Sequence, residues 1–373
     1  MRTHTALIAW SLLMMTALAA CAGAPAAVPT AVPPTPAPPT AVPPTAVPTL
    51  GPNAELRDIA TARKFYVGAA VNTDALAAEP EYARVLGASF NQVTPENVMK
   101  FGLIHPIPGY YDWGPADALV KFAEDHGMRV HGHTLLWHQQ LPPFIEDPKL
   151  TPADAEKAMA EHIAAVVGRY KGRIAEWDVV NEAIDDNARP RDSVWRRLVG
   201  PDYIEKAFRL ARAADPDVKL FYNDYNGEEM NAKSDAIYTM VRDLKQRGVP
   251  IDGVGLQMHI TLAGPPDAKQ VAENIRRLGD LGLLVHISEM DVRQPIPPDT
   301  AALKRQARAY REILQVCLVA PNCTEFTTWG FTDKHSWVPD FFPGFGAALL
   351  FDDQYKPKPA YDMLKDTLRA AAK

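Results

Sequence analysis

Charged side chains are almost missing from the first 54 residues of this sequence. Arg2 is the only Arg, Lys, Asp or Glu among them, although the whole chain has 39 basic and 45 acidic residues of these types. The segment also lacks an apolar run that would span a bilayer comfortably, because the run from Ala6 to Ala20 has only 15 residues. A positive residue followed by a short apolar run is typical of a signal peptide. We therefore expect an exported chain with a boundary near residue 54.

The apolar run ends in Leu18-Ala19-Ala20-Cys21, which resembles the lipobox of bacterial lipoproteins. In that motif the cysteine is lipidated and becomes the mature N-terminus. The alternative is an ordinary signal peptide that is cut nearby, with a cysteine there by chance. In the lipoprotein interpretation three acyl chains are attached, and they would hold the protein to a membrane far more firmly than a single chain. We expect residues 1–21 to be a signal peptide and Cys21 to anchor the protein to the cell envelope, outside the cytoplasm.

Residues 22–52 lack the residue types that build a core. Eleven of the chain's 34 prolines lie here, and Ala-Val-Pro-Pro-Thr occurs at residues 31–35 and again at 41–45. Such a segment favours extended polyproline II, and at about 3.1 Å per residue it could reach on the order of 90 Å. We expect a Pro/Thr/Ala-rich linker that leads to a folded domain at residues 53–373.

Cysteine is scarce as well. Beyond Cys21 the chain has only Cys317 and Cys323, which flank Pro321-Asn322. An even pair in an exported chain is a candidate disulfide that closes a small loop. Two unpaired thiols are the alternative.

An excess of basic residues is also missing. The net charge of −6 argues weakly against a nucleic-acid partner, which would favour a basic surface. The composition, with 47% hydrophobic and 23% charged residues, is that of a globular protein, and the length suits one large domain or two ordinary ones. We expect no nucleic acid, no cofactor, no metal ion and a monomeric chain.

Short β-rich runs alternate with amphipathic helical patterns from residue 65 onward. Eight such runs predict an α/β fold, a (β/α)8 TIM barrel. A doubly wound sheet is the other interpretation, but it usually has a Gly-rich phosphate loop after its first strand, and residues 67–71 are not one. The predicted helices are residues 152–170, 203–214, 232–247, 268–281 and 301–318, the first with Thr151 as N-cap. The predicted strands are residues 65–71, 89–95, 129–137, 176–181, 219–225, 253–259, 284–291 and 325–331.

Nearly every predicted strand ends in polar or aromatic residues that a packed barrel interior does not favour. In a (β/α)8 barrel the carboxyl ends of all strands meet at the catalytic face. Any one of these residues could be structural, but eight strand ends that behave alike are hard to obtain by chance. They include Glu96, Asn97, His133, Asn181, Glu182, Tyr225, Gln257, His259, Glu289, Asp291 and Trp329.

Glu182 and Glu289 close the fourth and seventh predicted strands, each after a buried-looking run. Glycoside hydrolysis needs an acid that protonates the leaving oxygen and a carboxylate across the sugar, about 5–5.5 Å apart in retaining enzymes and about 6.5–9.5 Å in inverting ones. We predict Glu182 as the acid/base and Glu289 as the nucleophile. His259 and Asp291 are placed to keep Glu289 ionised by a donated hydrogen bond.

Further residue types near these strand ends suit a sugar. Asn, Gln, Glu, Lys and His match hydroxyl groups, whereas Trp and Tyr stack on the apolar face of a pyranose. Each aromatic residue alone is more often part of a core, except Trp337, which lies beyond the last strand beside polar residues. The candidates are Glu96, Asn97, Lys100, His133, Gln140 and Gln257 for hydroxyl groups and Trp137, Tyr225, Trp329 and Trp337 for stacking.

Seven ordered blocks carry a resemblance that covers essentially all of residues 55–370. They are Asn91-Gln-Val-Thr-Pro-Glu-Asn-Val-Met-Lys100, Gly132-His-Thr-Leu-Leu-Trp-His138, Trp177-Asp-Val-Val-Asn-Glu182, Tyr222-Asn-Asp-Tyr225, Gly255-Leu-Gln-Met-His259, Ser288-Glu-Met-Asp291 and Thr328-Trp-Gly-Phe-Thr-Asp333. Together they are similar to glycoside hydrolase family 10. The resemblance implies a (β/α)8 barrel and a retaining endo-β-1,4-xylanase that cuts xylan or xylo-oligosaccharides.

The resemblance also implies a role for each matching position. It makes Glu182 the acid/base and Glu289 the nucleophile. It places His259 and Asp291 behind the nucleophile and Asn181 at the sugar 2-hydroxyl. The subsite just before the cleaved bond is expected to be lined by Lys100, His133, Gln257 and Trp329. The next subsite outward is expected to use Glu96, Asn97 and Gln140, with Trp337 as a cap over that region. Cys317 and Cys323 match the family's disulfide.

Departures and alternatives remain. Met258 stands where the family often has a small residue, which leaves the local subsite shape in doubt, and Phe101 stands where it often has Trp. A metal-dependent hydrolase is an alternative because His131-Gly132-His133 has a ligand-like spacing, but that class places its pair on the first strand. A non-catalytic, lipid-anchored sugar-binding protein is a further alternative, but such a protein should lack one of the two catalytic carboxylates, and this chain has both Glu182 and Glu289. A related retaining β-glycanase for xylo-oligomers or mixed-linkage glucan stays open, because loops decide the substrate.

Overall fold

The structure is a computed structural model that describes residue 51 and residues 53–371. The predicted signal peptide with Cys21, and the predicted linker apart from Gly51, lie outside the described residues. Within the described part of the chain, no helix is both long enough and apolar enough to cross a membrane.

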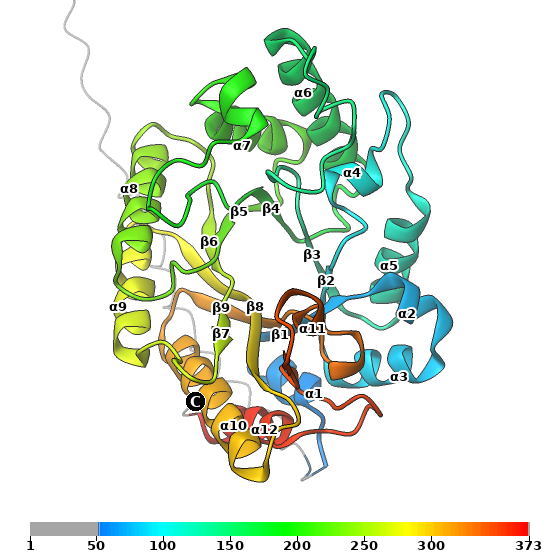
Figure 1. Cartoon of the computed structure of the whole chain (residues 1–373), viewed down its shortest axis with the longest axis vertical. Coiled ribbons are helices and arrows are strands. Elements are labelled where there is room, and N and C mark those ends of the chain that lie inside the picture. Colours follow the sequence, from blue (N-terminus) through cyan, green and yellow to red (C-terminus); the bar gives the residue numbers. More distant parts are fainter. Residues whose placement is uncertain (1–50, 52, 372–373) are drawn as a thin grey trace, which may run out of the picture. The chain divides into compact units, whose positions relative to one another are not determined.

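Eight parallel strands close into a barrel, as predicted. The ring runs from β1 through β2, β3, β4, β5, β6 and β8 to β9, and β9 closes it by pairing with β1 as well as with β8. Helices surround the strands (Figure 1). The barrel strands are β1 Tyr66–Val71, β2 Gln92–Pro95, β3 Arg129–Gly132, β4 Glu176–Asn181, β5 Lys219–Asp224, β6 Gly253–Leu256, β8 Leu284–Pro295 and β9 Cys323–Thr328.

All five predicted helices are confirmed to within two residues at each end. Thr151 caps α6 as predicted, because its side chain accepts a hydrogen bond from the Asp154 N–H at 3.2 Å. The α-helices are α1 Leu56–Ala62, α2 Thr73–Ala78, α3 Pro80–Ser89, α4 Phe101–Ile104, α5 Gly114–Asp125, α6 Pro152–Arg169, α7 Tyr203–Ala214, α8 Ala232–Gln246, α9 Ala268–Gly279, α10 Thr300–Val319, α11 Val338–Phe341 and α12 Pro359–Ala370. A π-helical turn covers Trp195–Val199 and a 3-10 turn covers Asp333–His335.

Several predicted strand ends are wrong, and each has a local cause. β3 stops at Gly132 instead of residue 137, because the following residues leave the ladder and Leu136 makes only an isolated bridge with Val180. The run 253–259 is interrupted at Met258, whose φ is +66°. Its last part forms β7 (His259–Thr261), which pairs with β8, while β10 (Phe345–Gly346) extends β8 on another edge.

The other ends shift for similar reasons. β2 begins at residue 92 instead of 89, since Ser89 still belongs to α3 and Phe90 is its C-cap. β9 ends at Thr328 instead of residue 331, shortly before Gly330 turns the chain with a φ of +91°.

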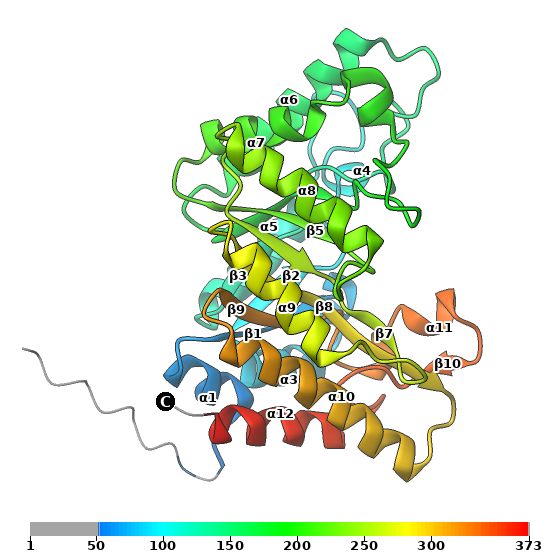
Figure 2. The ribbon, with the colours of Figure 1, turned by 90° about the vertical axis from the view of Figure 1, so that its left-hand side faces the viewer.

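The outer helices bury one face each against the barrel. In α9 the residues Val271, Ile275 and Leu278 recur at helical spacing, and each is at most 1% exposed. Burying one such side chain contributes about 1.5–3 kcal/mol. Figure 2 shows α8, α9 and α10 covering one side of the barrel. The helices thereby fix the strands whose carboxyl ends carry the predicted site.

Candidate active site

Glu182 lies directly after β4, all of whose residues are buried. The chain turns out of the strand at this residue, which has a φ of +57°. Its N–H donates to the carbonyl oxygen of Asn223 on β5 at 2.8 Å. The strand end is thus tied to its neighbour, and Glu182 is 8% exposed at the catalytic face.

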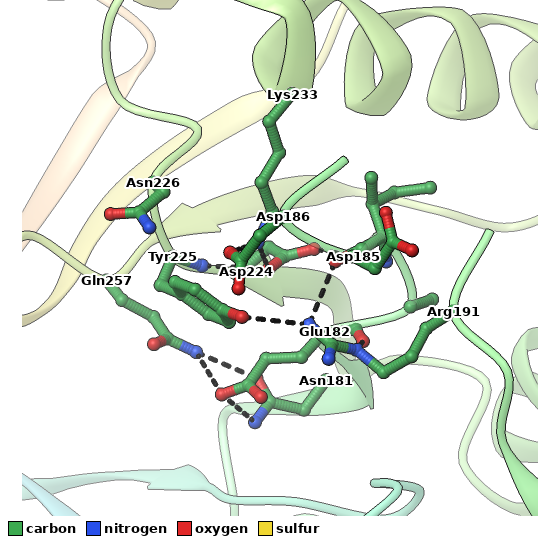
Figure 3. A network of polar contacts seen from close by, with 12 residues as sticks. Asn181, Glu182, Asp185, Asp186, Arg191, Asp224, Tyr225, Asn226, Lys233 and Gln257 are labelled. Carbon is green, nitrogen blue, oxygen red and sulfur yellow. Dashed lines mark hydrogen bonds and ion pairs between the residues drawn. The ribbon is translucent and has the colours of Figure 1, made fainter. Parts of the chain in front are cut away.

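The Glu182 carboxylate is surrounded by neutral donors. Trp137 Nε1 donates to Oε2 at 2.9 Å, and Gln257 Nε2 donates to Oε1 at 3.1 Å. The side-chain amide of Asn181 lies 3.3 Å from Oε1 (Figure 3). Two predicted residues, Trp137 and Gln257, therefore orient the carboxyl group through hydrogen bonds from uncharged donors.

Glu289 lies on β8 and is 4% exposed. Its Oε1 accepts a hydrogen bond from Asn223 Nδ2 at 2.6 Å, and its Oε2 lies 3.1 Å from His259 Nε2. The other ring nitrogen of His259 lies 2.7 Å from Asp291 Oδ2, which also accepts from Trp337 Nε1 at 2.8 Å. His259 and Asp291 thus stand behind Glu289, as predicted.

The charge state of His259 follows from these neighbours. Burial disfavours the imidazolium, but the negative charges and hydrogen bonds of Asp291 and Glu289 outweigh burial and raise the pKa of His259 to about 10. The ring therefore carries a positive charge near neutral pH and donates from both nitrogens. His259 thus presents a charged donor to Glu289.

Asn223 connects the two glutamates, although it was not among the predicted site residues. Its Nδ2 lies 3.0 Å from Asn181 Oδ1 and 2.6 Å from Glu289 Oε1. Ser288 Oγ donates to Asn223 Oδ1 at 2.6 Å and fixes the amide. The available signal was its place in Tyr222-Asn-Asp-Tyr225, at a polar strand end.

Lys100 occupies one flank of the site. Its ammonium group donates to Asn97 Oδ1 at 3.0 Å and lies 4.9 Å from the ring centre of Trp137 and 5.8 Å from that of Trp329. Burial lowers the pKa of Lys100, against the charges of Glu289, Glu96 and Glu182. The structure thus brings this lysine into the field of both central carboxylates.

Two further predicted residues adjoin Asn97. Gln140, at a φ of +47°, lies with its Nε2 3.5 Å from Asn97 Oδ1. Glu96 follows β2, and burial raises its pKa, an effect that the Lys100 charge opposes.

The ring of His133 contacts the carboxylate of Asp178. Its Nδ1 lies 2.8 Å from Asp178 Oδ2, and its ring meets Trp329 edge-on with centres 5.1 Å apart. Burial would raise the pKa of Asp178, but His131 and His133 lower it to about 2. Asp178 is therefore an anion that fixes the orientation of the His133 ring.

Tyr225 lies beside two cations that the sequence did not reveal. Arg191 donates from Nη2 to the Tyr225 hydroxyl at 3.0 Å and from Nε to the Glu182 carbonyl at 2.6 Å. Lys233 Nζ lies 3.4 Å from the Tyr225 ring centre and 2.9 Å from Asp224 Oδ1 (Figure 3). Burial raises the pKa of Asp224 to about 7, although Lys233 opposes this.

Comparison with known proteins identifies the family of this chain. The model of glycosyl hydrolase family 10 matches residues 55–367. Endo-1,4-beta-xylanase B of Thermotoga neapolitana is 42% identical over 321 residues, which are 85% of this chain and 92% of that protein. The crystal structure of xylanase 10B from Thermotoga petrophila RKU-1 in complex with xylobiose has a TM-score of 0.83 at 46% identity and covers 85% of this chain and 98% of that one. The chain belongs to glycosyl hydrolase family 10.

A second solved structure agrees with this assignment. The glycosylated endo-beta-1,4-xylanase from Gloeophyllum trabeum has a TM-score of 0.80 at 37% identity, with 85% of this chain and 99% of that chain covered. This family 10 protein is therefore a glycoside hydrolase with a (β/α)8 barrel.

Both departures from the family pattern lie in the core. Met258 is fully buried, and its N–H donates to Glu228 Oε1 at 2.9 Å. Phe101 stacks on His162 with ring centres 3.7 Å apart and on Trp195 at 5.5 Å. The doubt that Met258 raised about subsite shape is thus removed for its side chain, which does not reach the surface.

The predicted disulfide is confirmed. Cys317 at the end of α10 is bonded to Cys323 at the start of β9, with Cα atoms 5.1 Å apart. The bridge lies away from the catalytic face, at the amino end of β9.

Proposed function

We propose that this family 10 hydrolase is a retaining endo-β-1,4-xylanase that cuts internal bonds of xylan through a covalent glycosyl-enzyme intermediate. The contrast between the two glutamates supports this most strongly: neutral donors face Glu182, whereas the imidazolium of His259 faces Glu289. The relatives named as endo-1,4-beta-xylanases and the xylobiose complex of a related protein support xylan as the substrate.

The first step uses both carboxyl groups. The ionised Glu289 attacks the anomeric carbon while Glu182 donates its proton to the leaving glycosidic oxygen. The bond between anomeric carbon and Glu289 forms as the glycosidic bond breaks, and the released sugar carries the proton. Asn181, beside Glu182, would bind the 2-hydroxyl of the reacting sugar.

The second step reverses the roles. Formation of the ester removes the negative charge of Glu289, so Glu182, now a carboxylate, can take a proton from water. The water oxygen attacks the anomeric carbon, and Glu289 leaves as a carboxylate. Two inversions give a product with the original β configuration.

The remaining residues line the sugar-binding subsites in this proposal. The subsite before the cleaved bond is lined by four residues whose contacts join them to one another or to Glu182: Lys100, His133, Gln257 and Trp329. The outer subsite uses Asn97 and Gln140, which contact each other, together with Glu96. Trp337 covers the His259–Asp291 pair, and Trp137 and Tyr225 offer faces for stacking.

Product analysis on linear xylan tests the proposal. We expect NMR spectra of fresh products to show the β-anomer first and early products to span several chain lengths, as internal cleavage requires. An initial α-anomer would contradict the retaining mechanism, and xylose as the only early product would contradict endo action. Parallel assays on mixed-linkage glucan and short xylo-oligomers would identify a different preferred substrate.

A variant of the nucleophile supplies the matching test. Glu289→Ala should abolish hydrolysis, and azide should restore some turnover with inverted products, because the small anion takes the place of the carboxylate. The exposed Glu273 on α9 provides the control, since Glu273→Ala should keep full activity. Wild-type activity in Glu289→Ala would refute the assignment.

We also propose that the protein is exported and attached to the cell envelope through a lipid on Cys21, with residues 22–52 as the linker and residues 53–373 as the catalytic domain. The uncharged apolar run before Leu18-Ala-Ala-Cys21 supports this.

A further inference from the structure

The interior of the barrel carries a polar layer that the proposed hydrolysis does not use. Bulky apolar residues usually dominate this space in (β/α)8 barrels. Here four ionisable side chains, each at most 2% exposed, come from four strands: His131 of β3, Glu176 of β4, His286 of β8 and Glu325 of β9. His131 is the residue whose ligand-like spacing to His133 stood out in the sequence.

Strand register brings these four side chains together. His131 stands opposite Glu176 in the β3–β4 ladder, and His286 stands opposite Glu325 in the β8–β9 ladder. The two ladders lie on opposite sides of the barrel, because β5 and β6 separate them one way around and β1 and β2 the other. The side chains therefore meet across the barrel axis, with one possible ligand atom of each within 4.8 Å of all the others.

Each carboxylate has one oxygen held by a donor and one turned toward the histidines. Glu176 Oε2 forms an ion pair with Arg129, whereas Glu176 Oε1 faces His131. Glu325 Oε1 accepts a hydrogen bond from Thr327 Oγ1 at 2.8 Å, which leaves Oε2 pointing inward.

The histidines follow the same pattern. His131 Nε2 lies 3.0 Å from Asp178 Oδ1, and His286 Nε2 lies 3.1 Å from Thr324 Oγ1. In both rings Nδ1 is the atom that faces the centre. Metal-binding histidines typically present one nitrogen to the ion while a carboxylate or another polar group holds the other nitrogen.

Three pairs of these atoms have the spacing of a coordination shell. His131 Nδ1 lies 3.3 Å from Glu176 Oε1 and 3.7 Å from Glu325 Oε2, and His286 Nδ1 lies 3.2 Å from Glu325 Oε2. His286 and Glu176 are farther apart, with Nε2 and Oε2 as their nearest atoms at 3.9 Å. Zinc with bonds of about 2.0–2.2 Å places neighbouring ligand atoms of a tetrahedron about 3.3–3.6 Å apart. The four atoms lie at ion-pair distances, but among the described residues none of them forms a well-aligned hydrogen bond.

The charge of this layer is also compatible with a cation. Three buried carboxylates, those of Glu176, Glu325 and Asp178, lie near the guanidinium of Arg129 and the ring of His131. Burial disfavours the imidazolium form of His131, but the charges of Asp178 and Glu325 raise its pKa well above the usual value. A divalent cation bound in place of that proton would, together with Arg129, balance the three carboxylates.

We propose that His131, Glu176, His286 and Glu325 bind one Zn²⁺ ion inside the barrel. Two histidines and two carboxylates suit zinc, and four protein ligands fill a tetrahedral shell, which is typical of structural sites. The ion would join β3 and β4 to β8 and β9 and thereby stabilise the barrel. Through Asp178, which lies against both His131 and His133, it would also fix the floor of the sugar site. The proposal is independent of the proposed hydrolysis, and its test measures metal.

The first experiment measures metal in the wild-type full chain. The protein is produced in medium containing Zn²⁺, Mn²⁺ and Fe²⁺, purified without chelators, and analysed by plasma mass spectrometry. We expect about one equivalent of zinc per chain. After unfolding in guanidinium with EDTA and refolding with its disulfide intact, chain refolded with Zn²⁺ should melt several degrees higher than chain refolded without it. Folded wild-type chain with less than about a tenth of an equivalent after both preparations would overturn the proposal.

The second experiment changes one ligand and compares a matched control. Glu325→Gln keeps the shape of the side chain but removes its charge, so zinc content should fall at least tenfold. Glu289→Gln makes the same change at a buried glutamate of the catalytic face, so it should lose activity but keep its zinc. A folded Glu325→Gln variant with full zinc would place the metal elsewhere and overturn the site.

A third readout covers variants that fold poorly. Refolding the wild-type chain with Co²⁺ should give the intense visible absorption of a four-coordinate site, and adding one equivalent of Zn²⁺ during refolding should suppress it. A six-coordinate spectrum, or cobalt that a desalting column removes, would contradict a closed site of four protein ligands.

Discussion

At the scale of single residues, the neighbours of each carboxylate distinguish two groups of the same chemical type. Glu182 accepts hydrogen bonds from an indole and an amide, which carry no net charge. Glu289 faces His259, whose ring is charged near neutral pH because its pKa is raised to about 10. Glu289 therefore faces a charged donor, whereas the donors to Glu182 are uncharged. This contrast supports the proposed division of roles.

The proton-donor role of Glu182 predicts a dependence on the leaving group. Glu182→Ala should lose at least about 10²- to 10⁴-fold in kcat/KM on xylan but far less on a dinitrophenyl glycoside, because a good leaving group needs no proton. Without a base the ester on Glu289 should then break down slowly and give a burst of phenol. The measurement compares kcat/KM for both substrates in variant and wild type. An equal loss on both, with no burst, would mean that Glu182 is not the proton donor.

The raised pKa of His259 predicts how stability depends on pH. A histidine that gains carboxylate partners on folding stabilises the native state fully below its unfolded pKa of about 6.5 and loses that contribution as pH rises toward the folded pKa of about 10. The advantage of wild type over His259→Gln in unfolding free energy should therefore shrink between pH 7 and 10, by at most about 1.4 kcal/mol per pH unit. Urea titrations at three pH values measure it.

A surface histidine gives the control for this series. His126 is exposed, so His126→Gln should change stability by a similar amount at each pH. A His259→Gln difference that stays constant from pH 7 to 10 would show that the ring is not held as an imidazolium.

The sequence predicted the central residues well and the supporting ones poorly. His259, Asp291, Gln257 and Trp137 were predicted near the two glutamates and do contact them or one another. Arg191 was missed because it reaches the site from the loop after β4, outside every recognisable block. When the path of a loop brings an arginine into a site, the sequence around that arginine has no recognisable motif, so only the structure shows its role.

At the scale of secondary-structure elements, α6 gives a measurable case. Thr151 supplies the only side-chain acceptor that caps this helix among the described contacts. Thr151→Ala should cost about 1 kcal/mol and lower the melting temperature by about 2–4 °C. Thr151→Ser keeps the hydroxyl group and should melt close to wild type. If the Ala and Ser variants melt together, the hydroxyl does not stabilise the helix.

The existence of the strands was predictable, but several of their ends were not. Apolar runs identify buried strands because burial needs them, whatever the register. The ends of strands depend on where the pairing between strands stops. Pairing stops before Met258, which adopts a left-handed backbone conformation, and an apolar residue type does not predict that conformation. Likewise β8 continues to Pro295 because β7 and β10 pair with its far end, and such distant partners leave no mark in the run itself.

At the scale of the whole molecule, the distribution of charged residues distinguishes the N-terminal segment from the barrel domain. Only Arg2 carries charge in the first 54 residues, whereas the barrel domain carries the rest of the basic and acidic residues. A barrel of this kind was predictable because the alternation of strand and helix repeats eight times. The polar layer at its centre was not, since His131, Glu176, His286 and Glu325 lie far apart in sequence and only barrel closure brings them together.

The proposed anchor predicts where the whole protein is found in the cell. In Cys21→Ser the side chain that would carry the lipid loses its sulfur, so the protein should leave the membrane fraction for the soluble fraction and take up no labelled palmitate. Its specific activity on xylan should not change, because the barrel begins more than thirty residues later. Thr30→Ala, a change within the linker, should stay in the membrane fraction and keep its label. A Cys21→Ser protein that still carries palmitate would place the lipid on another residue.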